Sequence, residues 1–193
     1  MKRLPLLLAT GLGLLLLGGE PAGADTVRYR LGAPHGSISF KATSRMADAD
    51  GRFHRFQGEV RLDPKALERA VVSLAIDAAS VDTGILRRDD HLRSEDFFHV
   101  ARYPRITFAS RRVSPADGKI LLTGDLSLHG VSREVAVPVE LELSAGTLRA
   151  RGEFAIRMSD YGMTYRSWFN PLRDEVRILF DLRGVPAPPG SPS

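Results

Sequence analysis

The sequence predicts an all-β protein, an antiparallel barrel of about eight strands with a short helical lid segment over one end. Apolar and polar residues alternate through most of the chain, which is typical of strands that turn one face to an interior and the other to water. Short turn signals at residues 116–118 and 144–146 separate neighbouring runs as tight hairpins do. The alternation stops at residues 80–104, where seven charged residues fall between Arg87 and Asp96.

The first 24 residues have the three-part pattern of a secretory signal peptide. Two basic residues precede a leucine-rich run at 4–17, and Ala-Gly-Ala at 22–24 forms a cleavage signal. The run is shorter than the roughly 20 apolar residues that a membrane span needs. We therefore expect export to the periplasm, one domain at 25–184 and a disordered proline-rich tail at 185–193.

The composition excludes several kinds of site. The 193 residues contain no cysteine, so the chain has no disulfide, thiolate metal site, thiol nucleophile or lipoprotein anchor. The net charge is +4, and only four of the 27 basic residues are lysine. Arginine suits phosphate recognition, but these arginines are scattered among acidic residues instead of clustering as in a nucleic-acid-binding surface. We therefore expect no nucleic-acid partner.

Alternating runs predict the strands. They cover residues 27–31, 37–42, 55–62, 72–76, 106–108, 120–128, 134–143, 148–156 and 176–182. Their outward faces carry too many charges to contact lipid, which excludes an outer-membrane barrel with its apolar outside. Long strands without a Greek-key crossover favour a closed barrel, and a sandwich is the alternative.

The inward faces of these runs supply the candidate ligand-binding residues: Ile38, Phe40, Phe56, Leu74, Phe108, Leu122, Phe154, Ile178 and Phe180. A barrel of this size either fills its interior with side chains or holds one ligand. Small inward residues such as Gly58, Gly124 and Gly152 would leave volume unfilled, but glycines at bends in the strands would give the same pattern. Both explanations stay open. A slender apolar chain is the occupant that this lining favours.

The lid segment, residues 80–104, predicts one or two short helices on a long connection. Asp82 or Thr83 can cap the first helix and Ser94 the second. The residues expected to pack on the barrel end are Leu86, Leu92, Phe97 and Phe98. With its charged residues in water or paired, the segment would cover the open end of the barrel.

Four side chains of the lid segment are candidates for fixing the lid or binding a ligand head group: Arg87, Arg88, His91 and Arg93. Arginines at a barrel mouth can bind a phosphate or pyrophosphate. Pairing with neighbouring acidic residues at the surface is the alternative. We expect His91 to form a buried hydrogen bond that orients the lid.

The lid segment also carries a family resemblance. The stretches 80–83, 88–98 and 103–108 follow the pattern Ser-Val-Asp-Thr, Arg-Asp-x-His-Leu-x-Ser-x-Asp-Phe-Phe and Tyr-Pro-x-Ile-x-Phe of the YceI-like family of periplasmic proteins. Two further blocks, 124–131 and 157–163, match that family in order and at the right spacing. The sequence resembles the family over essentially all of its predicted domain.

This resemblance implies a lipocalin-like barrel with an elongated apolar interior that binds polyisoprenoid or other long lipid-like molecules. The chain departs from the family at Ser44, where many relatives carry a histidine. If that histidine contacts a head group, this protein binds its ligand differently or binds another one.

No catalytic or metal site is predicted. The five histidines show none of the close spacings of a ready chelate. Adjacent carboxylates such as Asp89 and Asp90 point apart on a helix, and the chain has no nucleophile elbow or phosphate-binding loop. We therefore expect no enzyme and no metal, and no cofactor other than a bound isoprenoid or fatty-acid-like lipid.

Two functions follow as expectations. The first is a periplasmic protein that carries or sequesters a long apolar ligand in a barrel tunnel. The second is an interaction module that holds no ligand and docks a membrane or redox partner through transient surface contact. The sequence does not indicate an oligomeric state.

Overall fold

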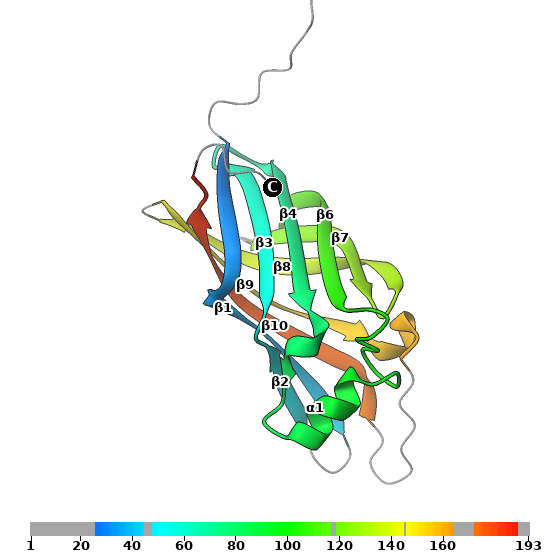
Figure 1. Cartoon of the computed structure of the whole chain (residues 1–193). Coiled ribbons are helices and arrows are strands. Elements are labelled where there is room, and N and C mark those ends of the chain that lie inside the picture. Colours follow the sequence, from blue (N-terminus) through cyan, green and yellow to red (C-terminus); the bar gives the residue numbers. More distant parts are fainter. Residues whose placement is uncertain (1–25, 45–47, 117–118, 145, 164–171, 189–193) are drawn as a thin grey trace, which may run out of the picture.

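The computed structural model describes residues 26–44, 48–116, 119–144, 146–163 and 172–188. The predicted signal peptide and the last five residues of the predicted tail lie outside them. The described chain is mostly strand, with one α-helix and two 3-10 helices (Figure 1). In chain order the elements are β1 (Val27–Ser44), β2 (Ala49–Phe53), β3 (Phe56–Asp63), β4 (Ala66–Asp77), η1 (Ala78–Ser80), β5 (Val81–Asp82), α1 (Leu86–Arg93), β6 (Arg105–Ala116), β7 (Lys119–Leu128), β8 (Val131–Ser144), β9 (Thr147–Arg157), η2 (Met158–Tyr161) and β10 (Leu172–Pro186).

Eight of these strands close into an antiparallel barrel, so the predicted fold class is confirmed. Their order around the barrel is β1, β3, β4, β6, β7, β8, β9 and β10, and pairing of β10 with β1 closes the ring. The two predicted hairpin turns join β6 to β7 and β8 to β9, which pair in register next to each turn. The alternating pattern therefore identified the strands that enclose the interior.

The sheet also differs from the prediction in two ways. The runs predicted at 27–31 and 37–42 are one strand, β1, with irregular pairing between Leu31 and Gly36. The strands β2 and β5 were missed. β2 reads Ala-Asp-Gly-Arg-Phe, which has low strand propensity, and it is held by pairing with β1 on one side and β5 on the other.

The two ends of the barrel are closed in different ways. Where β1 begins, Tyr29, Leu62 and Leu148 pack together, and each is at most 4% exposed. At the other end lies the lid segment with α1 (Figure 1). The cavity described below lies between these ends.

The last strand runs two residues past position 184, where the predicted domain ends. β10 continues to Pro186, with Val185 paired to Arg30 and Pro186 to Tyr29. The backbone N–H of Ala187 then donates to the carbonyl oxygen of Arg28 at 2.8 Å. These backbone contacts bind the start of the proline-rich stretch to the barrel.

Candidate functional site

A cavity of about 400 Å³ occupies the barrel interior. This volume lies within the roughly 300–1,000 Å³ that is typical of ligand pockets. Of the residues predicted to line it, those that do so are Ile38, Phe40, Leu74, Phe108, Leu122, Phe154, Ile178 and Phe180. Phe56 does not border the cavity. It is 8% exposed and packs in the core at the first position of β3, at the margin of the barrel wall.

The exposure of the inward side chains distinguishes a cavity from a packed core. A close-packed interior leaves its side chains almost no accessible surface. Leu74, Phe108, Phe154 and Ile178 lie inside the barrel, yet each is only partly buried. These side chains therefore face open space.

Two of the inward glycines make room for aromatic rings, and Gly124 also pairs with Ser110 directly beside a β-bulge, which agrees with one of the two explanations above. A Cβ on Gly124 would lie 2.7 Å from the Phe108 ring, and a Cβ on Gly152 would lie 2.6 Å from the Phe180 ring. Each phenylalanine thus lies over a glycine of the neighbouring strand, along the barrel wall. The glycines make room for rings, and the rings kept against the wall leave the centre free.

Other lining residues were missed by the sequence reasoning. They come from nearly every strand of the barrel and from the region of η2, and include Leu67, Ala70, Val137, Val139, Leu141, Met158 and Met163. The β8 residues belong to the predicted run 134–143, so their alternation could have placed them on the lining. Leu67 and Ala70 could not be placed in this way, because the pairing of β3 with β4 is irregular there.

Polar side chains are scarce around the cavity. Among the described lining residues, only Arg88, His91 and Thr107 have them, and the first two belong to α1. The few polar side chains of the lining therefore lie mainly at the lid end of an otherwise apolar cavity.

The lid segment forms the predicted short helix, but its caps were assigned wrongly. α1 begins after Ile85, which makes no side-chain capping bond, and Ser94 is the C-cap residue. Leu86, expected to pack on the barrel, is 81% exposed. Leu92, Phe97 and Phe98 do pack against the core, which confirms that part of the prediction. Phe98 meets Phe53 of β2 edge-on, with ring centroids 5.6 Å apart.

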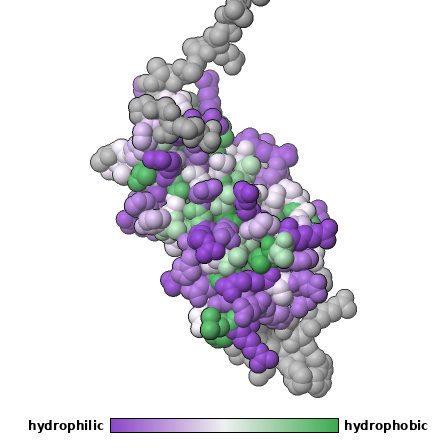
Figure 2. Space-filling view, viewed as in Figure 1, coloured by the Kyte–Doolittle hydropathy of each residue, from purple (hydrophilic) through white to green (hydrophobic). Residues whose placement is uncertain are grey.

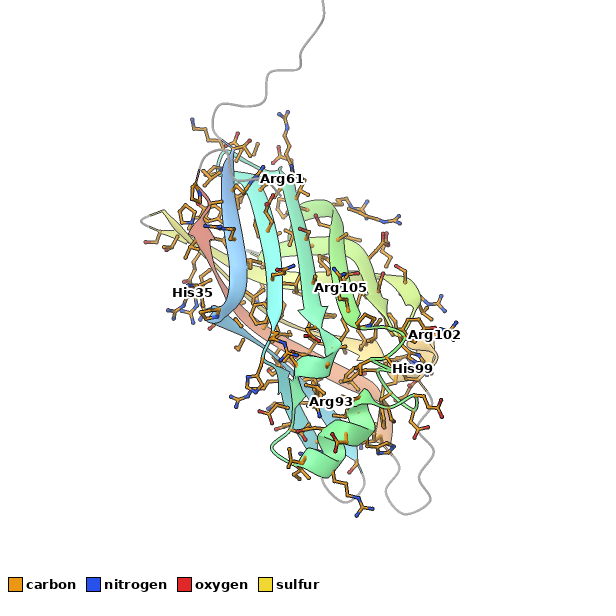
Figure 3. All side chains as sticks on the ribbon, in the orientation of Figure 1. His35, Arg61, Arg93, His99, Arg102 and Arg105 are labelled. Carbon is orange, nitrogen blue, oxygen red and sulfur yellow. The ribbon has the colours of Figure 1, made fainter. Side chains whose placement is uncertain are left out.

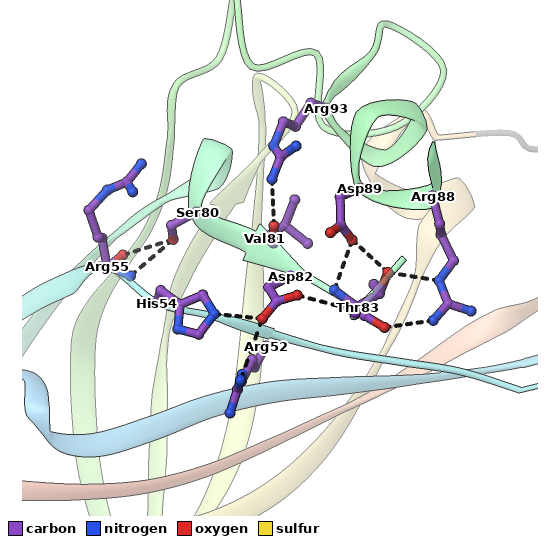
Figure 4. Close-up of polar contacts among 11 residues, drawn as sticks. Arg52, His54, Arg55, Ser80, Val81, Asp82, Thr83, Arg88, Asp89 and Arg93 are labelled. Carbon is purple, nitrogen blue, oxygen red and sulfur yellow. Dashed lines mark hydrogen bonds and ion pairs between the residues drawn. The ribbon is translucent and has the colours of Figure 1, made fainter. Parts of the chain in front are cut away.

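Polar side chains fasten α1 to the barrel (Figure 4). Arg93 donates from Nε to the carbonyl oxygen of Ala79 at 3.0 Å and from Nη2 to that of Val81 at 2.8 Å. Asp89 is buried and accepts hydrogen bonds from the backbone N–H and the hydroxyl of Thr83. The predicted head-group role of Arg93 therefore conflicts with the use of its donors by the barrel backbone.

The remaining lid candidates lie as follows. Arg88 donates from Nε to the Thr83 hydroxyl at 2.9 Å and from Nη2 to the Thr83 carbonyl oxygen at 3.0 Å. Arg87 is exposed. The prediction of a buried hydrogen bond for His91 is wrong: its side chain is 43% exposed and lies 3.1 Å from Asp96. The surface position of Asp96 on the next turn draws the imidazole outward.

A hydrogen-bonded pair, His54 and Asp82, lies where β2 meets β5 (Figure 4). His54 Nε2 is 2.7 Å from Asp82 Oδ2, and the backbone N–H of Gly84 donates to the other Asp82 oxygen at 2.8 Å. The hydrogen bond with His54, followed by that from Gly84, lowers the pKa of Asp82 to about 2. Both bonds favour the carboxylate form.

The histidines are spread over the described structure. Figure 3 shows His35 and His99 on opposite sides of the barrel. Within the described ranges, no three His, Asp or Glu side chains are grouped so that they could hold a metal ion.

Comparisons with known proteins agree with this architecture. The YceI-like domain matches residues 29–183. A UPF0312 protein of Vibrio parahaemolyticus is 35% identical over 138 residues, which cover 69% of this chain and 72% of the relative. The YceI protein of Escherichia coli O157:H7 is 33% identical over 141 residues, which cover 70% and 73%.

Solved structures share the fold. BcnA of Burkholderia cenocepacia aligns with a TM-score of 0.71 at 28% identity, over 77% of this chain and 95% of that one. A polyisoprenoid binding domain from Saccharophagus degradans, implicated in plant cell wall breakdown, aligns with a TM-score of 0.68 at 21% identity, over 83% and 99%. Since the domain match spans most of the sequence and includes every strand of the closed barrel, this chain belongs to the YceI-like family.

Proposed function

We propose that this protein is a periplasmic binding protein that holds one long apolar ligand, a polyisoprenoid or another lipid-like chain, for carriage or sequestration. The observation that carries the proposal is a cavity of about 400 Å³ whose described lining is apolar except for Arg88, His91 and Thr107. A polar metabolite would leave its hydrogen-bonding groups unpaired in such a space, at a cost of about 1–3 kcal/mol each.

The energetics favour a long chain over a short one. Burial of roughly 400 Å² of hydrocarbon contributes about 10 kcal/mol, at about 25 cal/mol per Å². Association costs roughly 4–15 kcal/mol. A long chain can therefore bind through burial alone, while a short apolar molecule cannot offset the cost of association.

The relatives support the class of ligand. The Saccharophagus degradans neighbour is described as a polyisoprenoid binding domain and shares the barrel architecture. That likeness supports a common fold. The apolar lining of the cavity in this chain is the reason to propose a similar ligand.

The proposed location rests on the sequence. The pattern at residues 1–24 is that of an exported protein. In the part of the chain that the structure describes, no helix is long and apolar enough to cross a membrane.

A catalytic role is not part of the proposal. At the cavity, Arg88 bonds to Thr83 and His91 to Asp96. Neither contact pairs a nucleophile with a base, as covalent catalysis requires.

The test is displacement of a fluorescent fatty acid from the purified protein by uncharged polyprenols of increasing length. Affinity should rise with chain length until the cavity is full and then level off. Equal, weak displacement by every length would contradict the proposal.

One observation favours the alternative function, docking to a membrane. Ile85 and Leu86, at the start of α1, are 52% and 81% exposed. Together with the exposed Arg87 they form a small apolar projection beside a positive charge, which suits a lipid surface. Binding of vesicles that is lost in Leu86→Ser, by a protein that displaces no fatty acid, would support this function instead.

A further inference from the structure

Two neighbouring strands of the barrel separate along half their length. β4 and β6 pair only at residues 73–77 and 105–109. Residues 66–72 of β4 and 110–116 of β6, which we call the seam, continue beyond this pairing. On its other side, β6 stays paired with β7 to its last residue. The barrel wall is therefore weaker at the seam than on either side of it.

The cavity reaches the seam from inside. Leu67, Ala70 and Val72 of β4 border the cavity, as does Val113 of β6. The three β4 residues keep part of their surface accessible, and Val71 on the outer side is 44% exposed. Figure 2 shows apolar surface over this side of the barrel, bordered by hydrophilic residues. Apolar side chains thus connect the interior with the outside along the seam.

The other routes into the described barrel are obstructed. The end near Leu62 and Leu148 is packed, with these side chains 2% and 1% exposed. β8 and β9 also part beyond Glu140 and Arg151, but the groove outside that gap is lined by charged side chains such as Lys119, Glu140 and Arg151, which an apolar chain would have to cross. η2 packs against the far end of the gap, where Tyr161 is 1% exposed.

The lid end is fastened more firmly than the seam. Moving α1 away would break the bonds from Arg93 to two backbone carbonyls and leave the buried Asp89 without Thr83. At the start of the seam, directly after the paired residues Ser73 and Ala109, one side-chain hydrogen bond joins the two strands. In it the Val72 N–H donates to the Ser110 hydroxyl at 2.8 Å. Opening the seam therefore breaks one such hydrogen bond, whereas moving α1 away breaks the two bonds of Arg93 and the two of Asp89 and costs correspondingly more.

We propose that the ligand chain enters and leaves the barrel sideways through the seam, and that α1 stays in place as a fixed end cap. The inference rests on the proposed function, since it supplies the route by which the same apolar chain reaches the cavity. A lateral opening lets a chain slide in along its length. An opening at the lid would require the chain to thread end-on past Arg88 and His91.

Stopped-flow kinetics with a fluorescent long-chain fatty acid test the route. Val71→Trp covers the seam from its outer side, Ala75→Trp adds the same bulk on the outer side of the paired part of β4, and neither residue borders the cavity. Arg93→Met loosens α1 while keeping most of its apolar stem. In Val71→Trp both the association and the dissociation rate should fall by roughly tenfold or more, within the range that such rates span among related complexes. The equilibrium affinity should change little, because a gate acts on both rates alike. Ala75→Trp and Arg93→Met should keep wild-type rates.

A cysteine pair provides a second test should Val71→Trp fail to fold. The chain has no cysteine, so Val72→Cys with Ser110→Cys can be oxidised to lock the seam, and Ser127→Cys with Ser132→Cys, on the directly paired β7 and β8, serves as the control. Oxidation should slow both rates only in the seam pair, and reduction should restore them. Faster exchange in Arg93→Met with unchanged rates in the seam variants would overturn the inference. If the wild-type protein does not bind the fatty acid at all, the proposed function fails instead.

Discussion

The Asp89 carboxylate on α1 is buried and accepts hydrogen bonds from both the backbone N–H and the hydroxyl of Thr83, six residues earlier in the chain. This contact holds the helix to the strand that precedes it. Asp89→Ala should lower the free energy of unfolding by about 1–3 kcal/mol, since the Thr83 donors are left without their acceptor. Urea unfolding followed by circular dichroism measures the change.

Asp90→Ala is the matched control for this prediction. The neighbouring carboxylate is 78% exposed and pairs with Arg93 at 3.1 Å. An exposed pair contributes only about 0–1 kcal/mol. Equal losses in the two variants would show that Asp89 does not fasten the lid segment.

Arg93 is predicted to stabilise the fold without selecting a head group. Arg93→Met removes its hydrogen bonds to Ala79 and Val81 and should cost about 1–3 kcal/mol in unfolding free energy. The exposed Arg87, replaced by Met, should have little effect. Affinities for a pyrophosphate lipid and for the matching uncharged alcohol should keep their ratio in Arg93→Met. A loss confined to the pyrophosphate lipid would restore Arg93 as a phosphate ligand.

Two phenylalanines, one at the cavity and one in the packed core, allow the cavity to be distinguished from the core by mutation. Phe154 borders the cavity, whereas Phe56 is packed in the core. Phe154→Trp should reduce the cavity and weaken binding of the longest chains first, with little loss of stability. Phe56→Trp should overfill its site and cost roughly 1–3 kcal/mol without a change in chain-length preference. Displacement assays on both variants decide this, and the reverse pattern would mean that the two roles are exchanged.

The barrel could be predicted because a strand with one face in water and one face buried shows alternating polar and apolar residues in its sequence. The run at 134–143 became β8 for this reason, and most inward residues of such runs border the cavity. The resemblance of the lid segment to the YceI-like pattern agreed with the domain match.

Other features depend on contacts that no local pattern encodes. The Phe40 ring lies over Gly51 of β2, a strand that does not alternate, so the sequence could not show that this ring stays at the wall. The role of Asp89 depends on Thr83 and the path of the chain between them. A run of charges does not reveal which member is buried.

Acid should remove the contribution that the Asp82 carboxylate makes to the stability of the fold. Its pKa in the folded protein is about 2, below the ordinary value of 3.8, so the stabilisation is present above pH ~4 and lost as the pH falls toward 2. Asp82→Asn should therefore be less stable than the wild type at pH 6, and the difference should shrink through this window. Thermal unfolding at several pH values measures it. A difference that stays constant down to pH ~2 would show that the His54 contact does not act through the carboxylate charge.

The central claim is that the barrel holds a long apolar chain, and native mass spectrometry of protein purified from the periplasm without detergent tests it most directly. The account predicts a protein bound to one lipid-like molecule. Solvent extraction should identify this molecule as a long-chain species. In Phe154→Trp the bound molecules should have shorter chains. Repeated preparations without bound ligand, from a protein that also takes up no polyprenol when one is supplied, would contradict it.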